Sequence, residues 1–334
     1  MRVAFEPLAL ARQRLAEEFD LYDLIVESID NGRMHTGGAA QKLARTARRS
    51  LYVNVIIGCY GLIEQTIDLL VTATAELYGN IYQANERLPE VVKTSHRELL
   101  LRCLVEGDRA RTRSAVAERV AIAALSAETS AAVSLVGAVF THSTANYRIG
   151  QIRDLFRRLD VSLDDRLKPD DLTVLDALGF SSYESFLEDL VSRRNELAHS
   201  YNDDGILDRA ALKNVSLVTI EFLDKVASFV GAEVLIKLAE ESLVAIGQVV
   251  RYWTGRLGVV VTSGSLKVGD RLTIVKGDRV AVLEVESLMS EDVAGSEFHY
   301  ADAALNVSVG TSGASEWMVS GRAYSLPHDW RDVW

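Results

Sequence analysis

The first two thirds of the chain carry apolar residues at helical spacing. Apolar side chains recur every three or four positions over residues 8–29, and again over residues 51–77, where no proline interrupts them. A stripe with this period is typical of an amphipathic or core helix. The same pattern predicts helices over residues 88–104, 115–140, 149–159, 183–199 and 208–241. Helices this long and apolar must cover one another's faces, so the sequence predicts a helical bundle.

After about residue 244 the pattern changes to short runs that are rich in β-branched residues. These runs predict strands, and glycines separate them, over residues 257–262, 271–275, 280–285 and 304–309. Short strands with regular turns are typical of a small closed or nearly closed β-barrel. We therefore expect a multi-domain α + β protein in which an all-α bundle precedes a small antiparallel β-barrel. An N-terminal helix and hinge are assigned to residues 1–40, the bundle to 41–243 and the barrel to 244–334.

Composition and charge limit the classes of function. The chain has 334 residues, of which 48% are hydrophobic, enough to bury two separate cores. Its formal net charge is −11, so any nucleic-acid site must be a local basic patch. Cys59 and Cys103 stand in no paired spacing, and the histidines outside residues 194–199 share no metal-ligand spacing. We expect no disulfide, metal or cofactor.

Two further patterns bear on location and nucleotide chemistry. Charged or polar residues interrupt every apolar stretch before it reaches membrane-spanning length, and no apolar run follows a basic start. We therefore expect a cytoplasmic protein that does not associate with a membrane. The phosphate-binding pattern of a P-loop is absent from the sequence, so nucleotide hydrolysis is not expected.

The end of the predicted helix over residues 183–199 carries the candidate chemistry. Residues 194–199 are Arg-Asn-Glu-Leu-Ala-His, and a turn-forming Asn-Asp-Asp-Gly follows at residues 202–205. At the start of this helix Ser181 and Glu184 predict a capping box. The motif resembles that of the HEPN superfamily of ribonucleases, in which four to six residues separate an arginine from a histidine and a polar residue, often asparagine, follows the arginine.

Two other segments extend the resemblance. Residues 53–64 are similar to the long early helix of the RiboL-PSP and MAE-type HEPN groups, and residues 146–159 are similar to their mid-domain segment. Together the likeness covers about residues 45 to 235. It implies a metal-independent endoribonuclease that acts as a homodimer on an RNA substrate and leaves a 2′,3′-cyclic phosphate and a 5′-hydroxyl. A toxin or an antiphage defence effector is the biological role that fits such an activity.

The residue types suit this chemistry because RNA carries its own nucleophile, the 2′-hydroxyl. His199 has the side chain whose ordinary pKa is closest to neutrality, so it can take the 2′ proton or protonate the leaving oxygen. Arg194 stays charged and offers a planar fork of donors to the phosphoryl oxygens. The catalytic candidates are therefore Arg194 and His199, with Asn195 and Glu196 beside them.

Helix geometry places a constraint on this pair. Residues five apart on a helix are separated by roughly 140° around its axis, so Arg194 and His199 do not face the same way. They converge only if the final turn loosens or if two chains contribute, which is why a dimer is expected. Asn195 and Glu196 lie four and three positions before His199 and share its face, so we predict that one of them orients the imidazole.

Other arginines are candidates for holding RNA. Arg193 is more often a surface or phosphate-contacting residue than a catalytic one, and Arg109, Arg111 and Arg113 lie in a basic stretch. A second basic stretch spans residues 42–49. Either stretch is equally compatible with a solvated face that pairs with local acids. The motif itself also has a structural interpretation, in which Arg194 lies near the negative end of the helix dipole and His199 caps the helix.

The C-terminal region has its own resemblance. Residues 258–275 include an apolar-Gly-Asp turn between two predicted strands and look like the second-domain barrel of translation factors related to elongation factor Tu, a likeness that covers about residues 246–326. Glycine supplies the special backbone of such a turn, and aspartate bonds nearby amides. The barrel would recognise RNA or a protein trigger, or would be structurally inert. The alternative for the whole chain is a non-catalytic HEPN-type module that binds RNA or protein through its bundle and recruits a partner through its barrel.

Overall fold

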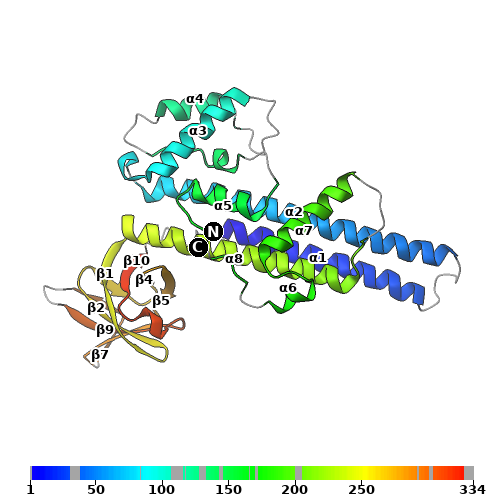
Figure 1. Ribbon diagram of the computed structural model, residues 1–334. Coiled ribbons are helices and arrows are strands. Elements are labelled where there is room, and N and C mark those ends of the chain that lie inside the picture. The colour runs from blue at the N-terminus through cyan, green and yellow to red at the C-terminus, as the bar shows by residue number, and fades with distance from the viewer. Residues whose placement is uncertain are drawn as a thin grey trace. The chain divides into compact units, whose positions relative to one another are not determined.

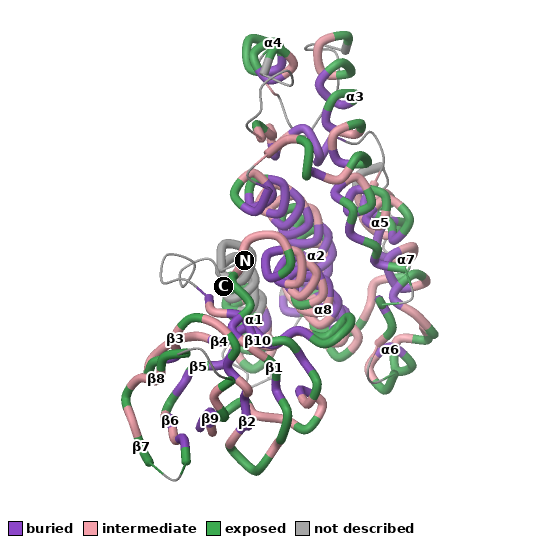
Figure 2. Tube along the Cα trace, turned by 90° about the vertical axis from the view of Figure 1, so that its left-hand side faces the viewer, coloured by how far each residue is buried: buried purple, intermediate pink, exposed green. Residues whose placement is uncertain are grey.

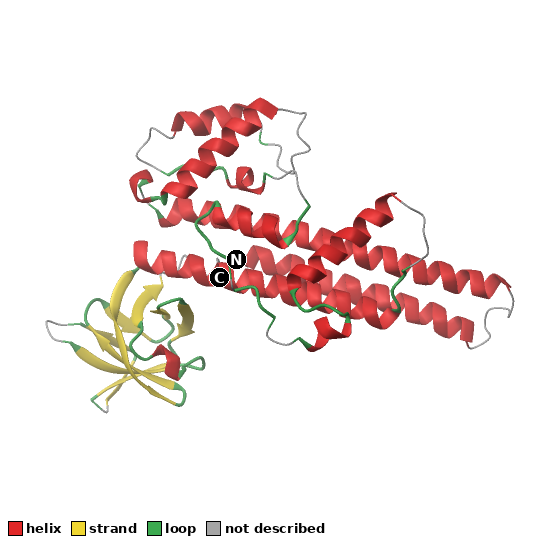
Figure 3. Ribbon diagram, viewed as in Figure 1, coloured by secondary structure: helices red, strands yellow, loops and turns green. Residues whose placement is uncertain are grey.

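The structure is a computed structural model that describes residues 2–30, 38–82, 84–106, 116, 118–127, 133–142, 146–164, 166–169, 172–199, 205–291, 293–300 and 304–326. The chain divides into two compact units. The helical unit lies within residues 3–77 and 85–229, and the sheet unit within residues 78–84 and 230–334. The predicted α + β class is confirmed at this level, because helices come first along the chain and strands follow (Figure 3).

The helices are labelled in Figure 1. They are α1 (Arg2–Asp30), α2 (Gly38–Ile81), η1 (Asn85–Arg87), α3 (Glu90–Glu106), α4 (Glu118–Ala127), η3 (Gly137–Thr141), α5 (Ile149–Arg157), α6 (Thr173–Ala177), α7 (Tyr183–His199) and α8 (Arg209–Glu241). The bounds of α7 and α8 follow the predicted segments closely. α2 is longer than predicted, chiefly because good helix formers precede its apolar run.

α2 is the core helix of the helical unit. Its apolar side chains include the fully buried Val55, Ile63 and Leu70, and Figure 2 shows buried residues recurring along its trace. α2 is long and apolar enough to cross a membrane over residues 40–81, but 56% of its most apolar window is buried within the protein. Burial of this kind is what a core helix shows, and it makes the membrane signal weak.

Polar contacts tie the surrounding helices to this core. The amide of Asn54 on α2 donates to Glu18 on α1 at 3.0 Å. Tyr183 on α7 donates to Glu221 on α8 at 2.6 Å. An ion pair joins Arg209 of α8 to Asp23 of α1. Apolar faces alone would let the helices slide or rotate against one another. These directional bonds select one relative position.

One predicted helix is wrong in its extent. The sequence predicts a helix over residues 115–140, whereas α4 ends at Ala127 and residues 133–136 are not helical. The chain then forms η3, where a Cβ added to Gly137 would lie 2.8 Å from the backbone oxygen of Thr72. This close approach to α2 is a tertiary contact that helical periodicity does not encode. The short helix α6 was not predicted either.

The start of α7 also differs from the predicted capping box. The side chain that caps the helix belongs to Ser182 rather than Ser181, because the backbone N–H of Ser185 donates to the Ser182 hydroxyl at 3.2 Å. Ser182 therefore occupies the N-cap position, and Ser185 stands where an acceptor such as Glu184 would complete the box. The predicted cap was one residue out of register.

The sheet unit begins before the first strand. Its helical part is the last portion of α8, where Ala239 packs with Val275 and Tyr324 of the sheet, and Ile236 and Leu243 pack against them. This packing explains why the boundary between the units lies at residues 229 and 230, inside a helix, rather than at residues 243 and 244, where the strand pattern begins.

The strands of the sheet unit form one large antiparallel ladder and a small one. They are β1 (Val244–Trp253), β2 (Arg256–Val261), β3 (Ser265–Lys267), β4 (Arg271–Lys276), β5 (Arg279–Glu284), β6 (Ser287–Ser290), β7 (Val293–Gly295), β8 (Glu297–His299), β9 (Leu305–Gly310) and β10 (Arg322–Leu326). The large ladder has the order β5-β4-β10-β1-β2-β9-β6-β7, and β3 pairs with β8. In the described residues β5 and β7 are its ends, so the pairing does not close into a barrel.

One apolar core lies inside this sheet. Inward side chains of β1, β2, β4, β6 and β9 pack into a single cluster, as Ile246, Leu257, Leu272, Leu288 and Val307 illustrate. The predicted apolar-Gly-Asp turn is confirmed. Gly269 has φ +89°, and the carboxylate of Asp270 accepts from the backbone N–H of Lys267 at 2.8 Å.

Candidate functional site

α7 carries all the residues of the predicted catalytic motif. Its buried face packs Phe186, Leu190 and Val191 into the helical unit and leaves residues 193–196 half-buried or exposed at its C-terminal end. His199 is the last residue of the helix, and its side chain lies outside the described residues. Arg109, Arg111 and Arg113 also lie outside the described residues, so their proposed contact with RNA stays a prediction.

Arg194 is held at the boundary between α7 and α2. Its guanidinium carbon lies 5.0 Å from the centre of the Tyr60 ring, and its Nη1 donates to Oδ1 of Asn195 at 3.1 Å. Both contacts are with uncharged groups. In the described part of the chain no ion pair engages this guanidinium, so no described carboxylate neutralises its charge. A cation over an aromatic face is stabilised while its edge donors stay available to a ligand.

Tyr60 is itself fixed by polar contacts. Its side chain is 2% exposed, and its hydroxyl accepts from the backbone N–H of Tyr147 at 3.1 Å and donates to Oδ1 of Asn146 at 3.5 Å. The Tyr147 hydroxyl donates in turn to Asp68 on α2. These residues join the start of α5 to α2 beneath Arg194. The ring is therefore a rigid support for the guanidinium.

Sequence analysis did not assign a role to Tyr60, Asn146 or Tyr147. All three lie in the two segments, 53–64 and 146–159, that resemble the HEPN groups. The sequence offered one signal, which was the tyrosine at position 60 within a largely apolar run. A tyrosine in such a run is expected to be buried, and a buried phenol usually needs a hydrogen-bond partner. That signal says that a partner exists. It does not say which residue provides it.

Arg193 has a different environment from its neighbour. Its Nε donates to Asp189 at 2.6 Å, and its Nη1 donates to the Gly205 carbonyl at 3.0 Å and to the Tyr52 hydroxyl at 3.5 Å. Partial burial works to lower the pKa of Arg193, but the hydrogen bonds to Asp189 and Tyr52 outweigh it, and that pKa lies above its ordinary value. These contacts join α7, α2 and the segment before α8, which is a structural use of the side chain.

Asn195 and Glu196 are the two candidates for orienting His199. The described contact of the Asn195 side chain is with Arg194, so its carbonyl oxygen is engaged on the arginine side of the motif. Glu196 is exposed on the outer surface of α7. Which of the two orients the imidazole stays a prediction, because the side chain of His199 lies outside the described residues.

The arginines of α5 do not form an open basic patch. Arg148 forms an ion pair with Glu188 of α7, and Arg157 forms one with Asp154 at 2.6 Å. Exposed pairs of this kind contribute little to stability, but they neutralise local charge. Arg194 thus stands out among the described arginines around α7, because the others named here are matched by carboxylates.

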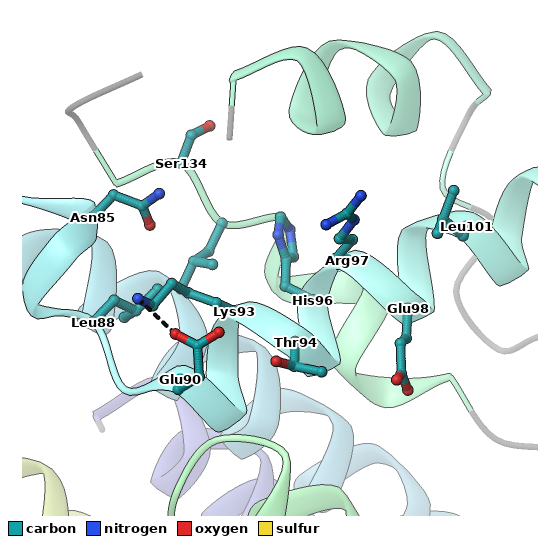
Figure 4. Close-up of a pocket in the computed structure, with 11 residues that line it drawn as sticks. Asn85, Leu88, Glu90, Lys93, Thr94, His96, Arg97, Glu98, Leu101 and Ser134 are labelled. Carbon is teal, nitrogen blue, oxygen red and sulfur yellow. Dashed lines mark ion pairs between the residues drawn. The ribbon is translucent and has the colours of Figure 1, made fainter. Parts of the chain in front are cut away.

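A pocket elsewhere in the helical unit holds the buried His96. The pocket measures about 550 Å³ and lies along α3, where Lys93 and Glu90 form an ion pair at 2.9 Å (Figure 4). His96 Nε2 accepts from the backbone N–H of Val136 at 3.0 Å, and the ring stacks on Phe140. Burial lowers the pKa of His96 to about 4, so the ring is neutral at pH 7. His96 therefore connects α3 to the segment before η3 as a structural residue.

Metal ligation finds no support in the described residues, where no three His, Cys, Asp or Glu side chains gather closely enough to hold an ion. Comparison with models of known protein families gives no match for the chain. A search of curated proteins finds no matching relative either. The candidate site must therefore be judged on its own geometry.

Proposed function

We propose that the chain is a metal-independent endoribonuclease that acts in the cytoplasm as a homodimer, as a toxin or antiphage defence effector. The observation that carries the proposal is the state of Arg194. Its guanidinium is half-buried over Tyr60, its described contacts are uncharged, and it lies five residues before a histidine at the end of the same helix. A positioned cation without a carboxylate partner is what a phosphoryl group in a developing transition state requires.

The proposed reaction uses the 2′-hydroxyl of RNA as the nucleophile. The 2′ oxygen attacks the adjacent phosphorus while the bond from phosphorus to the 5′ oxygen breaks, which leaves a 2′,3′-cyclic phosphate and a 5′-hydroxyl. His199 takes the proton from the 2′-hydroxyl, and His199 of the partner subunit gives a proton to the leaving 5′ oxygen. Arg194 donates to the non-bridging phosphoryl oxygens, whose charge grows as the bonds rearrange.

A second copy is proposed because residues five apart on a helix, as Arg194 and His199 are in the sequence, are separated by roughly 140° around its axis. The surface of α2 beside Tyr60 supports the idea that another chain docks there. Ile57 is 44% exposed, and a Cβ added at Gly58 or Gly61 would meet nothing within 4 Å. A twofold pairing across this face would bring the same patch of both chains together, as an isologous interface does.

We further propose that the sheet unit is a nearly closed barrel of the kind found in the second domain of translation factors, and that it recognises an RNA or protein trigger. Support comes from the single inward core shared by its strands and from the apolar-Gly-Asp turn. Backbone bonds between Gly269 and Val285 and between Val285 and Asp270 also bring the turn before β4 onto the end of β5.

The nuclease proposal is tested by incubating the purified full chain with mixed RNAs in excess chelator and analysing the ends of the products. We expect cleavage that leaves cyclic phosphate ends and that falls to background in His199→Ala. The matched control is His299→Ala, because His299 is an exposed histidine of the sheet unit outside the proposed site. Cleavage that requires added metal, or that persists in His199→Ala, would overturn the mechanism.

The alternative function, a non-catalytic binding module, is favoured by one observation. A pocket of about 770 Å³ in the helical unit is lined by Phe19 of α1, Val174 of α6 and Leu217 and Ile220 of α8, and Leu217 is 47% exposed. An open apolar groove along a helix fits a partner segment better than it fits RNA. If the chain is such a module, Leu217→Asp will weaken binding to the partner, and the unchanged chain will leave RNA intact.

A further inference from the structure

A second open pocket lies on the outer face of the sheet unit. It measures about 630 Å³ and is formed over β1, β2, β6 and β9 by the side chains of Val250, Trp253, Met289 and Asn306, among others. The inward residues of the same strands fill the apolar core, so the pocket lies on the opposite face of the sheet. Trp253 is 42% exposed and Val250 is 49% exposed. An open apolar pocket lined by an exposed indole can take a side chain of a partner.

The indole of Trp253 is held in place by its surroundings. Its ring lies against Gly258, where an added Cβ would come within 3.1 Å of the ring carbon Cζ3. The guanidinium carbon of Arg251 lies 5.1 Å from the ring centre. A larger residue at position 258 would displace the ring from the sheet. The glycine and the arginine together make Trp253 a rigid, amphipathic contact surface.

Two arginines give this pocket a positive character. Arg256 Nη1 donates to the Ser308 hydroxyl at 3.0 Å, and its Nη2 donates to the Ser287 hydroxyl at 3.1 Å. Arg251 contacts the indole ring. Within the described residues neither guanidinium has an ion pair, and Glu291 is the carboxylate that lines the pocket beside them. An apolar floor between two unneutralised arginines fits a segment that carries an aromatic side chain next to a carboxylate.

The chain itself contains a segment of this chemistry. The structure describes the chain up to Leu326, and residues 327–334 are Pro-His-Asp-Trp-Arg-Asp-Val-Trp. In an extended strand alternate side chains share one side, so Trp330, Asp332 and Trp334 would face the same way. Two indoles with a carboxylate between them match the aromatic floor and the two guanidiniums of the pocket.

The length of the segment decides which chain provides it. Ser325 pairs with Val244 at the start of β1, whereas Trp253 is the last residue of β1. Nine residues of strand span roughly 30 Å. Trp330 is only four residues beyond Leu326, which allows it roughly 14 Å of reach. Because this reach is shorter than the span of β1, we assign Trp330 in the pocket to a second copy.

We propose that the pocket over β1, β2, β6 and β9 binds residues 327–334 of a second copy of this chain, with Trp330 on the apolar floor and Asp332 between Arg251 and Arg256. The contact is separate from the α2 face beside Tyr60, and it does not depend on RNA cleavage. The apolar lining and the acidic net charge of −11 favour a protein segment over a polyanion.

The binding test uses a fluorescein-labelled synthetic peptide of residues 325–334. The receptor is the full chain with Trp330→Ala and Trp334→Ala, so that its own segment does not compete, and fluorescence anisotropy measures binding. We expect saturable binding that weakens at least tenfold in Trp253→Ala and in Arg251→Glu, and that also weakens with added salt. A peptide with Asp332→Asn should bind several-fold more weakly.

The matched control is Arg279→Glu, because Arg279 stacks on Trp317 at 4.3 Å in the same way but away from this pocket. Binding should be unchanged in this variant. Trp253→Phe keeps an aromatic ring and should retain much of the affinity, which separates loss of contact from loss of fold. Equal peptide binding in Trp253→Ala, or no binding by the receptor, overturns the proposal. Displacement of the peptide by single-stranded octauridylate would assign the pocket to RNA instead.

The identity of the donor chain is tested with a photo-crosslinking residue in place of Trp330 in the otherwise unchanged full chain. We expect illumination to produce a covalent two-chain species, and Trp253→Ala to abolish it. A cross-link found only within one chain would contradict the role of a second copy.

Discussion

Arg193 and Arg194 are neighbours on α7 and lie in two different regions of the helical unit. Arg193 joins α7 to Tyr52 of α2 and to Gly205, and Asp189 neutralises it. Arg194 lies over Tyr60, two helical turns further along α2, with a neutral amide as its described hydrogen-bond partner. Residue type and position in a motif therefore do not decide function. What decides it is whether a carboxylate in the fold already neutralises the side chain.

The largest expected effect is on the rate of RNA cleavage, which should depend on Arg194 and not on Arg193. Arg194→Ala should lower the rate of RNA cleavage by about 10²–10³-fold, because one donor to a developing oxyanion is lost. Its free energy of unfolding should change by less than about 1 kcal/mol, the size of a partly exposed cation–π contact. Arg194→Lys keeps the charge without the planar fork and should recover only part of the rate. Single-turnover cleavage and urea unfolding measure both quantities. Full activity in Arg194→Ala would remove the distinction between the two regions.

The second expected effect concerns His96, because its burial disfavours the charged form of the ring. His96 has a pKa of about 4 in the folded chain, against 6.5 for an ordinary histidine. Above pH 6.5 the ring is neutral in both states. As the pH falls from 6.5 to 4 the unfolded state gains a proton that the folded state does not, so stability is lost across this window, by at most about 3 kcal/mol.

The control for this prediction is His96→Gln, whose amide oxygen can still accept from the backbone N–H of Val136. Urea unfolding of both proteins between pH 7 and pH 4 isolates the contribution of the imidazole from that of the carboxylates. The difference in free energy of unfolding between the two should shrink as the pH falls. A constant difference would mean that His96 takes up its proton in the folded state as readily as in the unfolded one.

The smallest expected effect is on stability alone. Arg193→Ala should lower the free energy of unfolding by about 2 kcal/mol, because it leaves the partly buried Asp189 without its partner and removes the contact with Gly205. The matched control is Arg157→Ala, whose pair with Asp154 is exposed and should cost less than about 1 kcal/mol. Urea unfolding midpoints compare the two. If Arg193→Ala instead abolished RNA binding without loss of stability, the two arginines would share one functional region.

Much of the local structure could be predicted from the sequence. The periodic apolar residues of α7 and α8 gave their bounds nearly to the residue, and four of the strands followed from short β-branched runs. The failures share a cause. The predicted helix over residues 115–140 breaks before η3, where Gly137 packs against Thr72, sixty-five positions earlier in the chain. No local pattern records a contact of that separation.

The candidate site could likewise be predicted only in its local part. Arg194, Asn195 and His199 could be singled out from their spacing, because a motif is local. Tyr60 and the polar residues that hold it could not, because its bond to Asn146 crosses 86 positions of the chain. The predicted role of Asn195 toward His199 also depended on ideal helix geometry, whereas its described bond is to the adjacent arginine.

By itself the sequence determined where most of the long helices and four of the strands lie, the order of helices before strands, and which residues carry candidate chemistry. These are set by periodicity and residue type, which act over a few positions. Only the tertiary structure decided which arginine is neutralised, which histidine is buried, where α8 passes from one unit to the other and which outer face of the sheet holds a pocket. Charge neutralisation and desolvation depend on what surrounds a side chain in space, and those surroundings come from residues that are distant along the chain.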